Sequence, residues 1–376
     1  MFAFARYDLA MSDLPAQKPA PRGRGAQSNA SGRFESLTRD AFDDGWTDDD
    51  EAPAQLKTVV TPERSKTIIA RNNSPDVGFD RSINPYRGCE HGCIYCYARP
   101  SHAYVGLSPG LDFESRLFFK ADAARLLARE IAKPSYQVGP IHIGGNTDPY
   151  QPSERSMQVT RQVLEVLERT AHPLSIISKS ALIARDADIL GRMGRRNLAR
   201  AAISITTLDR KLARLMEPRA ATPERRLAAM AALSAAGAPT IVMFAPVIPG
   251  LNDHELESVL ERAVQAGAVG AGYVVLRLPR EIKDLFREWL EAQVPDRARR
   301  VMSLVRQMRQ GRDYDPEWGK RMKGEGPIAD ILAKRFAVAK RRFGLDRPST
   351  PLDLSQFRRP ISGDNQPDLF EALQAS

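Results

Sequence analysis

The cysteines constrain this chain more than any other feature. The sequence of 376 residues contains three, Cys89, Cys93 and Cys96, and all of them fall in one short segment. A complete set of cysteines in one C-x3-C-x2-C segment indicates a metal or cluster site, because scattered thiols are usually small buried apolar residues. Three thiolates hold three irons of a four-iron cluster and leave the fourth iron open to an exogenous group. A structural zinc site would need a fourth ligand, and His91 and His102 are available, so zinc stays an alternative.

The composition is that of an ordinary globular protein. Hydrophobic residues make up 42% of the sequence and charged residues 27%, which excludes disordered and membrane-spanning classes. No apolar run approaches the roughly 18 to 20 residues that cross a bilayer, and the first residues lack the apolar region of a secretory signal. We therefore expect a cytoplasmic protein that does not associate with a membrane. A reducing compartment also favours thiolates over disulfides.

The net charge of +9 permits an anionic partner such as a nucleic acid. Basic clusters can contact phosphate, although arginines at helical spacing among Ala and Leu are more often a solvated helix face. The clusters are Arg225–Arg226, residues 297–300 and residues 340–342.

The pattern of apolar residues predicts an α/β fold. Residues 1–57 are rich in Pro, Ser, Gly, Asp and Arg without periodicity, which predicts a disordered leader. From Val59 onward, short β-branched runs alternate with helical segments rich in Ala, Leu and Arg, as in βα units on a parallel sheet. Strands are predicted around Ile83 and over 139–144, 174–178, 201–206, 239–245 and 272–278; helices are predicted over 121–133, 154–170, 182–195, 223–236, 254–266 and from Glu281.

Six βα units predict a partial, TIM-like (β/α)6 barrel, whose functional residues gather at the carboxyl ends of the strands. We expect four regions: the leader over 1–57, the barrel over 58–280, a helical C-terminal extension over 281–345 and a flexible tail over 346–376. Three histidines have no ligand spacing between them and are expected in core or surface roles: His142, His172 and His254.

The cysteine segment resembles the signature of the radical S-adenosylmethionine (SAM) superfamily, C-x3-C-x2-C with an aromatic residue just before the third cysteine. Here Tyr95 precedes Cys96, and the segment follows the first predicted strand, as in that family. The resemblance covers about residues 80–280. It implies a [4Fe-4S] cluster held by Cys89, Cys93 and Cys96, with SAM bound at the open iron. It also implies reductive cleavage of SAM to a 5′-deoxyadenosyl radical and a reductant such as flavodoxin or ferredoxin.

The same resemblance suggests further SAM contacts, which join Tyr95 as expected cofactor-binding residues. The segment after the second strand is expected to meet the amino group of SAM, although an ordinary βα turn would also look like this. Lys179 suits the SAM carboxylate unless it is a plain surface lysine, and Ser204 and Thr206 point to one face of a strand, where they reach the cofactor or bond locally. The turn residues expected to contact SAM are Gly144, Gly145, Asn146 and Thr147.

Tyr95 and Tyr97 flank Cys96 as in the spore photoproduct lyase branch, which repairs thymine dimers in DNA. That branch uses a fourth cysteine as hydrogen donor, and this chain has Gly145-Asn-Thr-Asp at the corresponding place. The chain is therefore closer to the lyase-like group that carries Gly-Gly-Asn-Thr-Asp-Pro-Tyr, with Tyr97 as the expected catalytic residue. Its substrate is unidentified. The positive net charge and the resemblance to a DNA repair enzyme favour a nucleic acid or a component of one.

Other positions carry weaker expectations. Pairing within the loop and substrate contact are equally expected for the segment from Glu217 to Arg219, whereas Asn252 and Asp253 are expected to cap a helix. Substrate contacts in the C-terminal part are suggested only by position, at Tyr314, Trp318, Arg321 and Lys323. The alternative from another class is a nucleic-acid-binding protein whose cluster is structural or redox-sensing.

Overall fold

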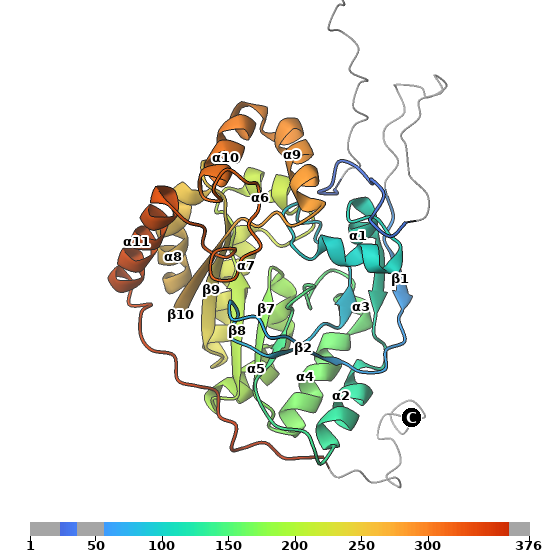
Figure 1. The fold of residues 1–376 in the computed structure, drawn as a ribbon. Helices are drawn as coiled ribbons and strands as arrows, with labels where there is room; N and C mark the ends of the chain where they lie inside the picture. The colour runs from blue at the N-terminus through green and yellow to red at the C-terminus, as the bar shows by residue number, and fades with distance from the viewer. Residues whose placement is uncertain (1–22, 36–55, 361–376) are drawn as a thin grey trace, which may run out of the picture.

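The computed structural model describes residues 23–35 and 56–360 and centres on one open, seven-stranded sheet (Figure 1). The strand order is β10-β9-β8-β7-β6-β3-β2. Its first six members are parallel, and β2 is an antiparallel edge strand on β3. The bounds are β2 Ile69–Arg71, β3 Arg81–Ile83, β6 Ile141–Ile143, β7 Leu174–Ser178, β8 Ala199–Ser204, β9 Thr240–Val247 and β10 Ala268–Val275. Six parallel strands confirm the predicted α/β class, and an open sheet of this kind is a partial barrel.

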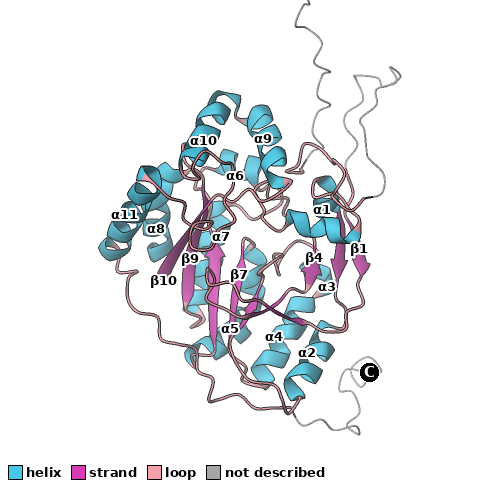
Figure 2. Ribbon diagram, viewed as in Figure 1, coloured by secondary structure: helices cyan, strands magenta, loops and turns pink. Residues whose placement is uncertain are grey.

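Helices follow the parallel strands and cover the convex face of the sheet (Figure 2). They bury the apolar residues of one strand face, such as Ile143, Ile176 and Phe244, which are all 0% exposed. The α-helices are α1 Leu111–Ser115, α2 Ala123–Ala132, α3 Glu154–Met157, α4 Val159–Arg169, α5 Ala187–Arg195, α6 Arg210–Met216, α7 Pro223–Ala235, α8 Leu256–Gln265, α9 Ile282–Gln293, α10 Pro295–Gln307 and α11 Pro327–Arg342. The 3-10 helices are η1 Arg99–Val105, η2 Ala181–Asp186 and η3 Asp253–Glu255.

The elements differ from the predicted ones in a few places. The predicted helix over 154–170 is two helices, because Gln158 takes a left-handed backbone conformation between α3 and α4. The last parallel strand begins earlier than predicted, at Ala268. A second, three-stranded sheet, which the sequence did not predict, packs beside the first strand of the barrel. Its strands, in order, are β1 Val59–Pro62, β5 Arg116–Phe119 and β4 Tyr86–Arg87.

Parts of the predicted leader and tail have fixed structure. Disorder was predicted over 1–57, but within residues 23–35 Arg24 and Ala26 are buried, so the prediction is wrong there. The predicted flexible tail is also wrong over 346–360, since Asp353 and Arg358 donate backbone hydrogen bonds to Asn197 and Thr170. The remainder of both regions lies outside the described residues. None of the described helices is long and apolar enough to span a membrane.

Candidate functional site

The cysteine loop leaves the carboxyl end of β3 and is held by backbone contacts on both sides. Gly88 and Gly92 have φ of 74° and 69°, a conformation that side-chain-bearing residues rarely adopt. The Cys89 N–H donates to the Phe113 carbonyl at 2.9 Å, and the Ile94 N–H donates to the Met216 carbonyl at 3.1 Å. Cys89 and Cys93 are buried and Cys96 is partly exposed. The two glycines and these backbone hydrogen bonds therefore fix the shape of the loop.

Arg99 and Glu114 form a fully buried ion pair behind the loop, 2.5 Å apart. Arg99 also donates to the carbonyl oxygens of Cys93 and Gly92, at 2.9 and 3.1 Å. A buried guanidinium of this kind needs many acceptors, and here two of them are the backbone of the ligand loop.

Residues 23–35, which we call the N-terminal strap, close over the other side of Glu114. The N–H groups of Gly25 and Ala26 each donate to the Glu114 carboxylate at 2.9 Å. A side chain at Gly25 would overlap the carbonyl oxygen of Gly92 in the cysteine loop. The strap is thus a missed component of the site, and the signal in the sequence was the Arg-Gly-Arg-Gly run at residues 22–25.

The three thiols lie near one another on one loop. Burial raises the pKa of Cys89 and of Cys93, and the pKa of both is raised further by neighbouring thiols. Among the described residues no group of three or more His, Cys, Asp or Glu converges on one ion position.

Tyr95 is anchored in a buried polar group below the cysteine loop. Its hydroxyl donates to the Glu217 carboxylate, which also accepts from Arg226 and, at 2.6 Å, from Thr206. Burial opposes ionisation of Glu217, but Arg226 and Lys179 outweigh it and lower its pKa. The predicted pairing within the loop is therefore wrong: Glu217 pairs with Arg226 of α7, and Arg219 pairs with Glu90 of the cysteine loop.

The other predicted polar residues on this rim have distinct surroundings. The Ser204 hydroxyl donates to the Ala245 carbonyl at 3.2 Å, so it bonds locally. The Lys179 Nζ lies 5.7 Å from the ring centre of Tyr95 and forms no ion pair within the described residues. The predicted helix cap at Asn252 is wrong, because its side chain makes no cap hydrogen bond to η3. Its amide donates instead to the Thr206 and Pro246 carbonyls, which joins two strand ends.

The Gly-Gly-Asn-Thr-Asp loop leaves the carboxyl end of β6 beside the cysteine loop. Gly144 has φ of 95°, and a side chain there would come within 2.7 Å of the Ile177 carbonyl oxygen. A side chain at Gly145 would make only ordinary contacts. The Asn146 N–H donates to the Asn84 side-chain oxygen at 2.7 Å, and the buried Thr147 hydroxyl donates to the Tyr86 carbonyl at 3.2 Å.

Asp148 joins this loop to the end of β7. It accepts from the Ser178 hydroxyl and from the Lys179 N–H, both at 2.7 Å. Burial opposes its ionisation, but His91 and these hydrogen bonds outweigh burial and hold its pKa at about 2. The carboxylate thereby fixes Lys179 relative to the glycine loop.

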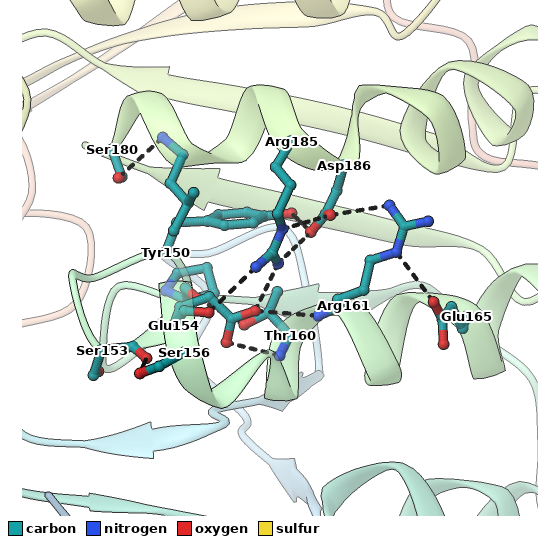
Figure 3. A network of polar contacts seen from close by, with 12 residues as sticks. Tyr150, Ser153, Glu154, Ser156, Thr160, Arg161, Glu165, Ser180, Arg185 and Asp186 are labelled. Carbon is teal, nitrogen blue, oxygen red and sulfur yellow. Dashed lines mark hydrogen bonds and ion pairs between the residues drawn. The ribbon is translucent and has the colours of Figure 1, made fainter. Parts of the chain in front are cut away.

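A second buried network holds the same two loops from below (Figure 3). Glu154, at the start of α3, accepts from Arg185 at 2.7 Å and from the Thr160 N–H at 3.0 Å. Asp186 accepts from Arg185 at 2.9 Å and from the Tyr150 hydroxyl at 3.0 Å. The network spans the segments that follow β6 and β7, so it fixes the distance between the two rims of the site.

Tyr97 lies on the open side of the cysteine loop and is 47% exposed. Its hydroxyl donates to the Gly145 carbonyl, and the Arg277 guanidinium lies 5.0 Å from its ring centre. Arg277 follows the last parallel strand and was missed in the sequence, although that position is where barrel function gathers.

The C-terminal candidates do not gather in one place. Arg321 donates to Asp76 and, at 2.5 Å, to Ser74, so it joins two loops. Trp318 and Lys323 are exposed.

Comparison with known proteins agrees with this geometry. The family model described as the radical SAM superfamily matches residues 83–263. The uncharacterized protein Rv2578c of Mycobacterium tuberculosis is 32% identical over 281 residues, which cover 74% of this chain and 80% of that protein. This chain belongs to the radical SAM superfamily. Members of the superfamily use a [4Fe-4S] cluster and SAM, and these are the cofactors of this chain.

Solved structures show the same fold at low sequence identity. Spore photoproduct lyase complexed with dinucleoside spore photoproduct has a TM-score of 0.51 and 14% identity, over 76% of this chain and 79% of the lyase chain. The uncharacterized protein MJ0683 of Methanocaldococcus jannaschii is 28% identical over 46% of this chain and 62% of that protein. These similarities extend the fold assignment beyond the cysteine loop to most of the chain.

Proposed function

We propose that this protein is a radical SAM enzyme that acts on a substrate bound on the concave side of the sheet. One observation carries the proposal: the three-thiol loop, the glycine loop after β6 and the unpaired Lys179 after β7 lie on one rim, tied together by Asp148. When bound, the cluster supplies the electron that cleaves the sulfonium bond of SAM to give a 5′-deoxyadenosyl radical.

The proposed roles follow from what each side chain touches. Cys89, Cys93 and Cys96 hold the irons. Tyr95 lies along the cluster side and is oriented by Glu217. Lys179 is the counter-ion of the SAM carboxylate. The SAM amino group is assigned to the carbonyl and side-chain oxygens of Gly144, Gly145, Asn146 and Thr147. Ser204 and Thr206 are not assigned to SAM, because their hydroxyls donate to the Ala245 carbonyl and the Glu217 carboxylate.

Tyr97 is the proposed hydrogen donor to a substrate radical. Its O–H bond would break, the hydrogen atom would pass to the substrate carbon, and the resulting tyrosyl radical would be restored by one electron and one proton with the help of the reductant. Its exposed ring beside Cys96 and Arg277 supports this assignment.

The test is anaerobic reconstitution of the full chain with iron and sulfide. We expect about four irons per chain and 5′-deoxyadenosine on reduction in the presence of SAM. A Cys93→Ala variant should lose both. A reconstituted wild-type protein that leaves SAM intact would contradict the proposal.

A second function is favoured by one surface. Arg297, Arg299 and Arg300 of α10 are exposed and have no ion pair within the described residues. A nucleic-acid-binding protein with a structural or redox-sensing cluster would bind single- or double-stranded DNA with a steep salt dependence and would not turn over SAM. Loss of DNA binding in Arg299→Gln, with SAM left intact, would favour this alternative.

A further inference from the structure

The concave face of the large sheet carries a row of polar residues that the proposed function has not used. Strand register places Ser82 of β3 beside His142 of β6, His142 beside Ser175 of β7, and Ser175 beside Arg200 of β8. Neighbours in register point to the same face of a sheet. The contacts agree, because His142 Nδ1 and Ser175 Oγ lie 2.9 Å apart.

This row faces away from the helices. The residues on either side of it along the strands, such as Ile141, Leu174 and Ala199, are 0% exposed and belong to the core beneath the helices. His142, Ser175 and Arg200 are partly exposed instead. The only ring against His142 among the described residues is Phe79, stacked at 4.1 Å, from the loop that leads from β2 to β3.

Arg200 is the unexplained member of the row. Its guanidinium forms no hydrogen bond or ion pair within the described residues. Burial lowers the pKa of its guanidinium, with no carboxylate nearby to offset this effect. Fully buried cations are paired in proteins, whereas Arg200 is partly exposed and can bind water or an anion. A bound anion would provide the missing partner.

A cavity lies at the β3 end of the row, next to Phe79, and its lining includes none of Ser82, His142, Ser175 and Arg200. The cavity, of about 480 Å³, is lined by residues 72–74 and 77–81 and by Gly139 and Pro140, which immediately precede β6. Phe79 belongs to this lining and also stacks on His142. Cavities of a few hundred Å³ are the usual size of small-molecule sites.

The polarity of the concave face changes along the strands, from a polar row through an apolar row to the polar rim. Above the polar row, the register joins Ile177 to Ala202 and Ala202 to Ile241, which is an apolar row. Above that lie Ser204 and the rim that carries Lys179. With a rise of about 3.3 Å per residue, Arg200 lies roughly 13 Å along β8 from Ser204. A molecule spanning this distance would have one end at the rim, an apolar middle and an anionic end at Arg200.

We propose that the substrate is a small amphipathic organic anion, a carboxylate or a phosphate, whose charged end is bound by Arg200 beside Ser175 and His142. This inference rests on the proposed function for the identity of the rim. It narrows the substrate from nucleic acid in general to a molecule or chain end thin enough to enter the concave side of the sheet.

The first experiment measures thermal unfolding of the full chain in inorganic phosphate and, separately, in acetate, both at constant ionic strength. A ligand that binds only the folded state raises Tm in a saturable way. We expect such a rise in wild type with at least one anion, and which anion acts distinguishes phosphate from carboxylate. Arg200→Gln should abolish the rise, Arg200→Lys should retain part of it, and Arg225→Gln on an exposed helix position should leave it unchanged.

The Tm of Arg200→Gln measured without added anion separates an anion-binding role of Arg200 from a structural role. Removal of an unpaired cation should leave the Tm of Arg200→Gln equal to or above that of wild type, whereas removal of a structural arginine would lower it. Chemical shifts of the His142 imidazole in wild type provide a measurement independent of any variant, and they should move on addition of the active anion. An unchanged rise in Arg200→Gln, or no response of wild type to either anion, would overturn the inference.

Failure of this inference is distinguishable from failure of the proposed function. Formation of 5′-deoxyadenosine without substrate should be the same in Arg200→Gln and wild type, because Arg200 lies far below the rim. Anion binding that depends on Arg200 in a protein that leaves SAM intact would refute the proposed function and leave the anion site standing.

Discussion

At the scale of single residues, the buried carboxylates around the cysteine loop are paired, whereas two nearby cations form no ion pair within the described residues. Glu114, Glu217 and Asp148 are each saturated by two or more donors. Such networks are rigid, because a partly satisfied buried carboxylate is costly. The cations are Lys179, whose ammonium lies over the face of Tyr95, and Arg277, over the face of Tyr97. Unpaired cations among saturated anions are the groups free to bind a ligand.

We therefore expect Lys179→Ala to weaken SAM binding by about 10- to 100-fold, the effect of losing one charge-assisted hydrogen bond of roughly 1.5–3 kcal/mol. Equilibrium dialysis of SAM with the reconstituted protein measures this Kd. The matched control is Lys211→Ala, which removes an exposed lysine of α6. Equal affinity in the two variants would exclude Lys179 from the SAM site.

At the scale of elements, the N-terminal strap and the cysteine loop behave as one unit. The strap has no strand or helix of its own, yet it contacts Glu114 through Gly25 and Ala26, and α9 through Ser28, which donates to Glu288 at 2.7 Å. Composition alone predicts disorder for such a segment. Its order comes from acceptors supplied about 90 residues later in the chain, where Gly25 and Glu114 are separated by 89 positions.

Gly25→Ala should push the strap away from the cysteine loop, because its Cβ overlaps the Gly92 carbonyl. We expect a loss of about 1–3 kcal/mol in the free energy of unfolding, as for other overpacked sites, and faster loss of iron to a chelator. Gly78→Ala is the control, since a Cβ there meets nothing within 4 Å. Indistinguishable unfolding and iron loss in the two variants would show that the strap does not support the loop.

At the scale of the whole molecule, the segment after α11 runs down the side of the sheet and along its base (Figure 1). There Phe357 packs edge-on against His172, with ring centres 5.2 Å apart, and Tyr136 lies with its hydroxyl 2.7 Å from His172 Nε2. The His172 Nδ1 lies 3.0 Å from the Pro173 carbonyl and so carries the proton. The neutral ring is thus fixed by contacts from three parts of the chain.

Burial lowers the pKa of His172 to about 4 from its ordinary value of 6.5. Below about pH 6.5 the unfolded chain takes up a proton that the folded chain does not, so stability falls with pH until about pH 4. From this one group we expect a loss of about 2 kcal/mol between pH 7 and pH 5.

Denaturant unfolding at the two pH values measures the effect, with His172→Gln expected to show a correspondingly smaller pH dependence. His254→Gln, at an exposed position, should retain the wild-type dependence. A His172→Gln variant with the full wild-type dependence would place the responsible group elsewhere.

Much of the fold is predictable from local patterns, because each βα unit repeats the same alternation of buried and less buried residues. Ile176 and Ala201 alternate with less buried neighbours, and Thr222 and Pro223 mark the start of α7. The cysteine loop, Tyr95 and the glycine loop are equally local, since their spacing in the chain reflects the geometry of one turn. The short strands β1, β4 and β5 were not predicted, because they depend on pairing between distant segments.

Local order along the chain was therefore enough to identify the α/β class and the superfamily, and it predicts Cys89, Cys93 and Cys96 as the cluster ligands. The partners of Glu114, the pairing of Glu217 and the row from Ser82 to Arg200 emerged only in the folded molecule. Each of them joins residues from separate strands or loops, and no spacing in the sequence encodes their proximity. Register between parallel strands, set by packing of the helices on the opposite face, places the unpaired Arg200 on the concave side of the sheet.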